Sequence, residues 1–285
     1  MPLALHSLLL DGARRGNRIV MVGERGHVLV SVDRGLRWTQ AKVPTRALLT
    51  AVTMVGSDLA WAVGHGPVVL HSTDGGASWV RQPVPDAVAE PLLDLWFADA
   101  RRGIVIGAFG RVMTTEDGGA TWRAGLIDAR EPHANAIIPA PPRTLYVAAE
   151  FGMIFRSIDD GRSWNGLDVP DGGSFFGILC PRDDVLLAYG LRGRLVRSAD
   201  GGLSWTTIAT GSADTLVAGL SRNDGSVLLG GLRGTVLLSR DGGQTFELRR
   251  RSNRQAVSAF VDLAERGTLV LGKGGFELIR DLGNL

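Results

Sequence analysis

Aspartate residues recur at a nearly constant interval along most of this chain. Successive members of the series are 41, 43, 42, 41 and 41 residues apart, and the series comprises Asp33, Asp74, Asp117, Asp159, Asp200 and Asp241. Carboxylates act as general acids and bases and as ligands for hard metal ions, so a recurring aspartate could indicate catalysis or metal binding. Six copies with one period near forty instead favour a structural unit that is repeated along the chain.

Each aspartate lies in the same short motif, which we call the Asp box. A Ser or Thr precedes the aspartate by two residues, a Gly follows it by two, and an aromatic residue follows the Gly by three. The aromatic residues are Trp38, Trp79, Trp122, Trp164, Trp205 and Phe246. Glycine suits a hairpin turn because it adopts positive φ without steric cost, and the Asp and Ser oxygens can accept backbone N–H groups there. We therefore expect the box to be structural, with its aromatic ring sealing one repeat against its neighbour.

The other residues that could support chemistry are scattered. The five histidines show no metal-ligand spacing, and the single cysteine, Cys180, permits no internal disulfide. Residues 267–274 nearly match a phosphate-binding loop, but Gly274 stands where a Ser or Thr would hold magnesium. The sequence therefore predicts no catalytic residue, no metal site and no bound cofactor.

One enzymatic alternative remains, because sialidases and some glucanases are propellers that carry Asp boxes. Sialidases use an arginine cluster, a Tyr nucleophile and an acidic proton donor. The only tyrosines here, Tyr146 and Tyr189, are expected in second strands, away from the inner strands where a central site would form. Asp94 and Asp262 are the candidate carboxylates on inner strands. A glycoside hydrolase or glycan-binding propeller of the sialidase type therefore stays open as the alternative.

The segments that must position the boxes have the pattern of short strands. In the third repeat, the apolar runs 103–107 and 111–115 flank a Gly-containing turn and lead into the box. Another run precedes them at 92–97, and a fourth follows the box aromatic at 122–127. Short β-branched runs bounded by Gly are typical of strands joined as hairpins, and four strands per repeat make one blade of a β-propeller.

A glycine that opens the third strand recurs seven times, at positions 26, 66, 110, 152, 193, 234 and 275. The predicted fold is therefore all-β: a seven-bladed β-propeller of four-stranded antiparallel blades, as a single domain over residues 1–285. The last blade is expected to be incomplete at the C-terminus and to need a strand from the N-terminal side. Because only Met1–Ser7 precede Leu8, we expect either a very short closing strand or a chain that continues upstream of Met1. We favour the second interpretation.

Charge and hydropathy exclude some classes of partner. The net charge of +2 is too small to indicate nucleic-acid binding, and no apolar run is long enough to span a membrane. Residues 1–10 are apolar but lack the basic segment and cleavage site of a signal peptide.

The charges are nevertheless unevenly placed. Turns between second and third strands all emerge on one face of a propeller, and here they are mostly basic. A basic face can steer an acidic partner toward it. The residues that we expect to bind a partner are Arg25, Arg111, Arg192, Arg194, Arg233 and Lys273.

The third repeat, residues 95–122, has the sequence Leu-Trp-Phe-Ala-Asp-Ala-Arg-Arg-Gly-Ile-Val-Ile-Gly-Ala-Phe-Gly-Arg-Val-Met-Thr-Thr-Glu-Asp-Gly-Gly-Ala-Thr-Trp. It resembles one repeat of the photosystem II stability/assembly factor family. The spacing of Phe97, Asp99 and Gly103 before the box distinguishes this family's repeats from those of sialidases. Copies two to six extend the resemblance over essentially the whole chain. The resemblance implies a seven-bladed Asp-box propeller.

The same resemblance implies a non-enzymatic scaffold that binds a membrane protein, or its extramembrane segment, during assembly of a membrane complex. It favours an exported, periplasmic location, although the given sequence shows no signal peptide, and it makes a resistance-nodulation-division transporter one candidate partner. We expect a monomer that does not itself span the membrane and binds no nucleic acid. Besides the glycosidase, a second alternative is a structural module whose partner contacts the blade edges.

Overall fold

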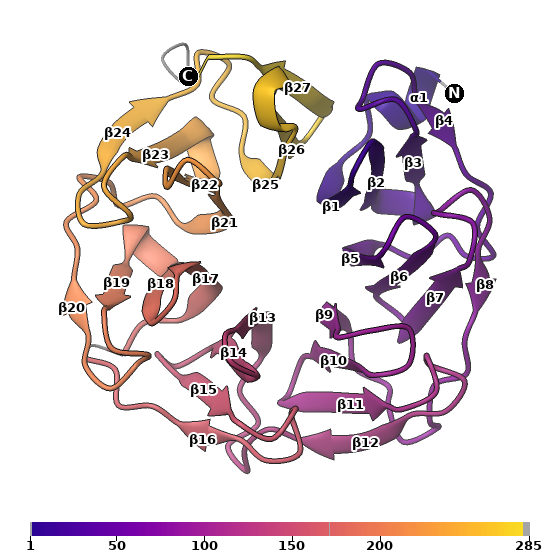
Figure 1. Cartoon of the computed structure of the whole chain (residues 1–285), viewed down its shortest axis with the longest axis horizontal. Helices are drawn as coiled ribbons and strands as arrows, with labels where there is room; N and C mark the ends of the chain where they lie inside the picture. Colours follow the sequence, from indigo (N-terminus) through magenta and orange to yellow (C-terminus); the bar gives the residue numbers. More distant parts are fainter. Residues whose placement is uncertain (1, 171, 282–285) are drawn as a thin grey trace. The chain divides into compact units, whose positions relative to one another are not determined.

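The structure, a computed structural model, describes residues 2–170 and 172–281. Its fold is an all-β seven-bladed propeller, as the sequence predicts, and its blades are antiparallel sheets whose strands lie side by side in chain order (Figure 1). The residues form two compact units. Unit 1 comprises residues 1–131 and 260–280, and unit 2 comprises residues 132–259 and 281–285.

Unit 1 contains blades 1, 2 and 3 and most of blade 7. Blade 1 consists of β1 (Leu9–Arg15), β2 (Arg18–Gly23), β3 (Val28–Ser31) and β4 (Thr39–Gln40). Blade 2 consists of β5 (Leu49–Val55), β6 (Leu59–Gly64), β7 (Val68–Ser72) and β8 (Val80–Arg81). Blade 3 consists of β9 (Leu92–Phe97), β10 (Gly103–Gly107), β11 (Arg111–Thr115) and β12 (Arg123–Leu126). Blade 7 consists of β25 (Val257–Asp262), which begins in unit 2, β26 (Thr268–Gly272) and β27 (Gly275–Ile279).

Unit 2 contains blades 4, 5 and 6. Blade 4 consists of β13 (Ala134–Ala140), β14 (Thr144–Ala149), β15 (Ile154–Ser157) and β16 (Asn165–Gly166). Blade 5 consists of β17 (Phe175–Arg182), β18 (Val185–Gly190), β19 (Leu195–Ser198) and β20 (Thr206–Thr207). Blade 6 consists of β21 (Leu216–Ser221), β22 (Val227–Gly231), β23 (Thr235–Ser239) and β24 (Glu247–Arg250).

The N-terminal segment does not supply the short closing strand that the sequence offered as one interpretation. Residues Pro2–Leu5 form a single helical turn, α1, which contacts β27. Proline is favoured at the first position of a helix and cannot donate a ladder hydrogen bond, and no β-branched residue follows it to favour a strand. Within residues 2–170 and 172–281, blade 7 therefore has three strands. Met1 lies outside the described residues.

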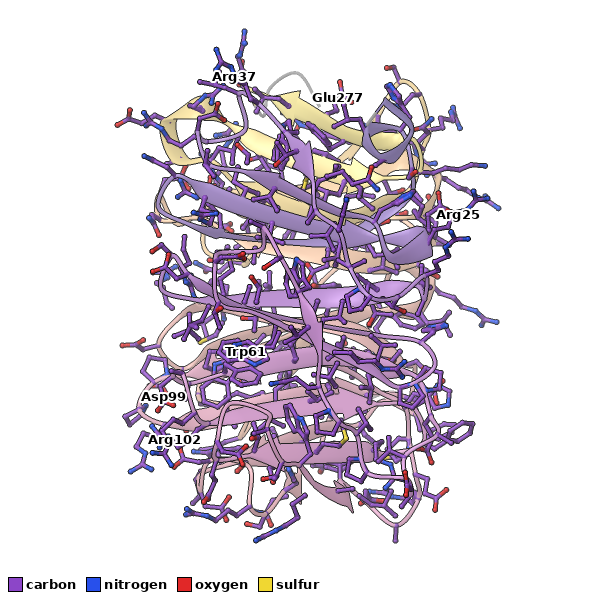
Figure 2. The ribbon with its side chains drawn as sticks, turned by 90° about the vertical axis from the view of Figure 1, so that its right-hand side faces the viewer. Arg25, Arg37, Trp61, Asp99, Arg102 and Glu277 are labelled. Carbon is purple, nitrogen blue, oxygen red and sulfur yellow. The ribbon has the colours of Figure 1, made fainter. Side chains whose placement is uncertain are left out.

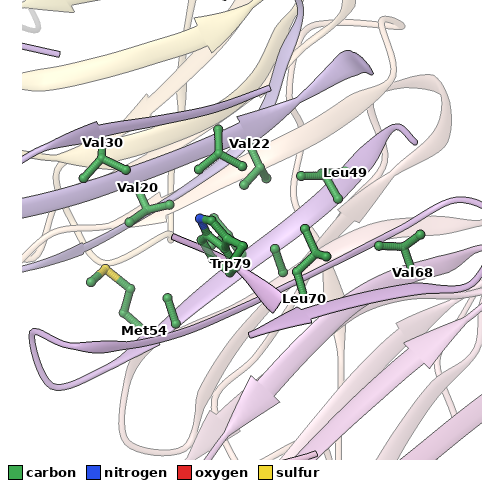
Figure 3. Close-up of a cluster of buried hydrophobic side chains, with 12 residues drawn as sticks. Val20, Val22, Val30, Leu49, Met54, Val68, Leu70 and Trp79 are labelled. Atoms are coloured by element: carbon green, nitrogen blue, oxygen red, sulfur yellow. The ribbon is translucent and has the colours of Figure 1, made fainter. Parts of the chain in front are cut away.

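Within each unit, the core lies between neighbouring blades, where the face of one sheet meets the next sheet. Second strands such as β14 and β18 are buried along their whole length, and apart from Thr144 they consist of apolar residues and glycine. Between blades 1 and 2, Trp79 packs among Val20, Val30 and Leu70 (Figure 3). In unit 2, Trp205 occupies the equivalent place between blades 4 and 5. At these two interfaces the box tryptophan is buried between the two blades.

Blades 7 and 1 meet in the same manner within unit 1. The ring of Trp38 packs against Phe276 with 4.9 Å between ring centroids. The Arg266 guanidinium donates a hydrogen bond to the carbonyl oxygen of Arg34 at 2.5 Å. The contact between these two blades is thus formed by packed side chains and by a hydrogen bond to the first Asp box.

Candidate functional site

The Asp boxes are closed hydrogen-bond networks. In the second box, the Ser72 hydroxyl donates to Asp74 Oδ1 at 2.8 Å and accepts the Gly76 N–H at 2.8 Å. Asp74 Oδ1 also accepts the Ser78 N–H at 2.9 Å, and Oδ2 accepts the Ser78 hydroxyl at 2.6 Å. The carboxylate is therefore committed to its own turn, as the structural interpretation of the box predicts.

This network has one member beyond the residues of the predicted motif. A second hydroxyl residue, immediately before the aromatic, completes the carboxylate's bonds in five boxes, as Ser78, Thr121, Ser163, Ser204 and Thr245. Its signal was visible as the repeated Ser or Thr at that position. The first box has Arg37 there, and only its backbone N–H bonds Asp33, at 2.9 Å.

These bonds favour the ionised form of the carboxylates. The hydroxyls of Thr121, Ser163 and Ser204 are the main cause that lowers the pKa of Asp117, Asp159 and Asp200 from 3.8 to about 2. Such carboxylates are poor proton donors at neutral pH, because a catalytic acid needs a pKa near the working pH. No group of three or more potential metal-binding side chains occurs within the part of the chain that the structure describes.

The two tyrosines are unsuited to the nucleophilic role that a sialidase mechanism requires. Tyr146 and Tyr189 are both buried, and the Tyr146 hydroxyl donates to the Gly201 carbonyl at 2.7 Å. Burial is also the main cause that raises the pKa of Tyr146. Of the inner-strand carboxylates, Asp94 accepts the Leu95 N–H at 2.8 Å and Asp262 accepts the Ala264 N–H at 3.1 Å.

The turns between second and third strands have a recurring backbone geometry. Their central non-glycine residue has a left-handed φ of 53–58° in five blades, and these residues are Arg25, Phe109, Phe151, Arg192 and Arg233. A left-handed conformation is costly for side chains other than Gly, Asn or Asp. Each of these five turns therefore holds a large side chain in a conformation that glycine or asparagine adopts at lower cost.

The backbone before each turn is held firmly. In blade 5 the Leu191 N–H bonds the Ser174 carbonyl at 3.0 Å, and a Cβ on Gly190 would lie 2.1 Å from that same oxygen. Blade 6 repeats the bond between Leu232 and Thr215 at 2.9 Å. The turns thus present their side chains from a fixed backbone.

Four of the six basic residues expected from the sequence are exposed on these turns. Arg25 and Lys273 are exposed in unit 1, and Arg192 and Arg233 are exposed in unit 2. Figure 2 shows Arg25 at the edge of blade 1 opposite to the edge that carries Arg37. The basic turn is therefore separated from the Asp-box turn of the same blade.

The other two expected residues make contacts within their own blade. Arg111 pairs with Glu90 at 2.9 Å. Arg194 donates to the Gly173 carbonyl at 2.7 Å and lies over the ring of Phe175, 4.5 Å from its centroid. Glu90 and Gly173 each lie 21 residues before the arginine that they contact, in the loop that precedes the first strand of the blade. This shared spacing is the sequence signal that could have revealed the two contacts.

Blade 6 repeats the 21-residue spacing with a hydroxyl and a carboxylate. The Thr235 hydroxyl donates to Asp214 Oδ2 at 2.7 Å, and this bond is the main cause that lowers the pKa of Asp214. Arg250 lies 3.0 Å from the same carboxylate and Arg233 lies 3.7 Å from it. One carboxylate thus faces two guanidinium groups, and the Arg233 side chain remains 79% exposed.

Apolar side chains accompany the exposed arginines of unit 2. Leu191 and Leu232, which precede Arg192 and Arg233, are exposed, and so is Phe151 on the equivalent turn of blade 4. The two leucines were missed in the sequence because they follow an apolar strand and look like its continuation. Arginine and aromatic residues are enriched at protein-binding surfaces.

An open groove of about 600 Å³ lies at the outer part of blade 2 in unit 1. Its walls include three prolines, Pro67, Pro83 and Pro85, with Arg81 and Asp86. None of the residues that the sequence marks for partner binding lines it, so it does not coincide with the basic turns.

The family model described as photosynthesis system II assembly factor YCF48 matches residues 3–88 and 82–171, which together span more than half of the chain. A photosystem II assembly protein, Ycf48, from Synechococcus sp. (strain JA-2-3B'a(2-13)) is 29% identical over 144 residues, which cover 49% of this chain and 43% of that protein. The chain thus spans about two fifths of the length of the curated relatives that it matches.

Two solved structures support the fold. One, described as YCF48 bound to D1 peptide, has a TM-score of 0.80 at 19% identity and covers 95% of this chain and 92% of that chain. A streptogramin B lyase has a TM-score of 0.82 at 12% identity, and the match covers 96% of this chain and 95% of that chain. At these identities the likeness concerns the fold alone, and the fold accommodates both a peptide-binding protein and an enzyme. The family match over residues 3–171 establishes that the chain belongs to the photosynthesis system II assembly factor YCF48 family.

Proposed function

We propose that this protein is a non-enzymatic scaffold that binds an extramembrane peptide segment of a membrane protein during assembly of a membrane complex. The observation that carries the proposal is the set of exposed arginines at left-handed positions in unit 2, Arg192 and Arg233, each beside an exposed leucine. Family membership supports it, and so does the related propeller described as bound to a D1 peptide. An exported location would suit such a partner.

The electrostatics of this surface favour an acidic segment. Arg233 and Arg250 share the Asp214 carboxylate, and Arg233 is the more distant of the two, at 3.7 Å against 3.0 Å for Arg250. A carboxylate of a partner can therefore approach the exposed guanidinium of Arg233 without first breaking a close ion pair. Arg192 carries a second exposed cation on the neighbouring blade. Leu191 and Leu232 would supply apolar contact beside these charges.

The catalytic alternative finds less support in the side chains. A sialidase-type site needs an accessible Tyr nucleophile, and both tyrosines are buried. Neither the box carboxylates, with their lowered pKa values, nor the inner-strand Asp94 and Asp262 form an evident acid–nucleophile pair. We therefore propose that the protein does not hydrolyse glycosides.

Affinity capture from detergent-solubilised host membranes tests the function. The wild type would be compared with an Arg192→Glu/Arg233→Glu variant and with Arg162→Glu/Arg240→Glu, a control with the same charge change on exposed Asp-box residues of unit 2. We expect the wild type and the control to retain a membrane protein that the turn variant loses. Equal retention by all three proteins would place the contact elsewhere, and hydrolysis in a screen of glycoside substrates would overturn the non-enzymatic assignment.

A further inference from the structure

The first Asp box differs from its neighbours in unit 1. Its two most outward positions carry the aliphatic residues Val32 and Leu36, which are 62% and 67% exposed. The corresponding residues are Thr73 and Ala77 in the second box and Glu116 and Ala120 in the third. The first box is therefore the only one of these three that presents two bulky aliphatic side chains to solvent.

The same end of blade 1 is rich in arginine. The box contains Arg34 and Arg37, and Arg15 and Arg18 flank the adjoining turn, as the last residue of β1 and the first of β2. The two turns touch, because the Arg34 N–H donates to the Asn17 carbonyl at 2.8 Å. Figure 2 shows Arg37 on the side of blade 1 that faces away from Arg25. We call these four arginines with Val32 and Leu36 the blade 1 tip.

The four guanidinium charges of the blade 1 tip outnumber the one carboxylate among them, Asp33, which interacts electrostatically with Arg37. Arg15 donates to the Met54 carbonyl at 3.2 Å, and Arg18 donates to the carbonyls of Asp74 and Gly75 at 3.3 and 3.2 Å. Within residues 2–170 and 172–281, none of the four arginines forms an ion pair with an acidic side chain. Asp33 accepts the Leu36 and Arg37 N–H groups at 3.0 and 2.9 Å and stays ionised, so the tip keeps an excess of positive charge.

The backbone of the blade 1 tip is fixed before any partner arrives. Arg34 has a φ of 60°, its N–H is bound to Asn17, and its carbonyl accepts the Arg266 guanidinium from blade 7. A preorganised turn loses little conformational entropy on binding. The tip is thus a rigid projection with aliphatic side chains among cationic ones.

We propose that the blade 1 tip docks onto an anionic lipid surface. Arginine side chains bind lipid phosphates while aliphatic side chains enter the boundary between headgroups and acyl chains, so a membrane interface uses both components of the tip. Nucleic-acid phosphates would use the arginines but leave Val32 and Leu36 in water. This docking involves a different surface from the partner-binding turns and does not depend on the proposed function.

Co-sedimentation with vesicles tests the proposal. The protein would be mixed with vesicles of phosphatidylcholine alone or of phosphatidylcholine with phosphatidylglycerol. We expect binding only to the anionic vesicles, and we expect it to weaken when ionic strength approaches about 1 M, where the Debye length falls to about 3 Å. Wild-type protein that fails to bind anionic vesicles, or that binds neutral ones equally well, would overturn the proposal.

Two variants separate the components of the tip. Arg34→Glu/Arg37→Glu should weaken binding at least about tenfold, because each basic residue near an anionic surface contributes measurably to affinity. Val32→Ser/Leu36→Ser should weaken it by a smaller factor and leave its salt dependence unchanged. Arg81→Glu/Arg123→Glu is the matched control, since both residues are exposed on outer strands of unit 1 and the charge change is the same.

Thermal unfolding would first establish that each variant is folded. Vesicle binding by Arg34→Glu/Arg37→Glu equal to that of the wild type would exclude the tip as the contact. Binding of an acidic peptide by the tip, with no vesicle binding, would assign the surface to a protein partner and overturn the lipid proposal. Partner capture by unit 2 should be unchanged in these variants, so the two proposals fail independently.

Discussion

At the scale of single residues, the carboxylates of this chain divide into two groups by their surroundings. Box aspartates accept hydroxyl and N–H groups, which hold the pKa of Asp117 and Asp200 near 2. Asp11 on β1 accepts the Val52 N–H at 2.8 Å, yet burial dominates and raises its pKa from 3.8 to about 6. Local hydrogen bonding and desolvation thus act in opposite directions on the same functional group.

Asp11 should therefore destabilise the protein at neutral pH. Because its pKa is higher in the folded than in the unfolded state, its ionisation costs stability as pH rises from about 4 to about 6. Asp11→Asn keeps an oxygen for the Val52 N–H and removes that cost, so we expect it to raise the free energy of unfolding at pH 7 by about 1–3 kcal/mol. Denaturant unfolding at pH 7 and pH 4 would measure this, and a gain that is equal at both pH values would refute the explanation.

At the scale of elements, contacts between blades depend on the box aromatics. Trp79 is 6% exposed between blades 1 and 2, whereas Trp38 between blades 7 and 1 is only half-buried. Trp79→Ala should lower the free energy of unfolding by about 3–5 kcal/mol. Trp38→Ala should cost less, because less of its surface leaves water on folding. Chemical denaturation of both variants would compare them, and equal losses would contradict the ranking.

The turn of blade 5 offers a test of retained strain. Arg192 has a φ of 56°, and asparagine tolerates this conformation better than arginine. We expect Arg192→Asn to raise the free energy of unfolding by up to about 1 kcal/mol while it weakens capture of the partner. Thermal unfolding and capture would be measured on the same variant. Lower stability with unchanged capture would show that the arginine serves the fold instead.

The sequence was sufficient for the strands and the boxes because these depend on local patterns. Gly103–Gly107 and Arg111–Thr115 were predicted with the bounds that β10 and β11 have, and the box hydrogen bonds follow from residues at most four apart. The contacts of Arg111 and Arg194 were not foreseen, because they join segments 21 residues apart across a blade. The left-handed φ of Arg192 was also missed, since turns with Gly at the next position tolerate several conformations.

At the scale of the whole molecule, the chain combines a repeated fold with surfaces that differ between repeats. No helix among the described residues has the length and hydropathy needed to cross a membrane. The boxes repeat because they stabilise each blade, whereas the turn residues vary between Arg, Phe and His and so can specialise. Function in this account therefore resides in the turn side chains, such as those of the blade 5 and blade 6 turns.

The central claim is that the exposed turns of unit 2 contact a peptide segment of a membrane protein. Unit 2 has an exposed leucine on the blade 6 turn, Leu232, and another on the fifth Asp box, Leu203. The side chains are 45% and 76% exposed, respectively. Each would be replaced in turn by the photo-cross-linking residue benzoylphenylalanine, which leaves Arg192 and Arg233 in place. The account predicts that, in host membranes, position 232 cross-links to an extramembrane segment of one membrane protein and position 203 does not. Cross-linking from position 203 alone, or from neither position, would contradict it.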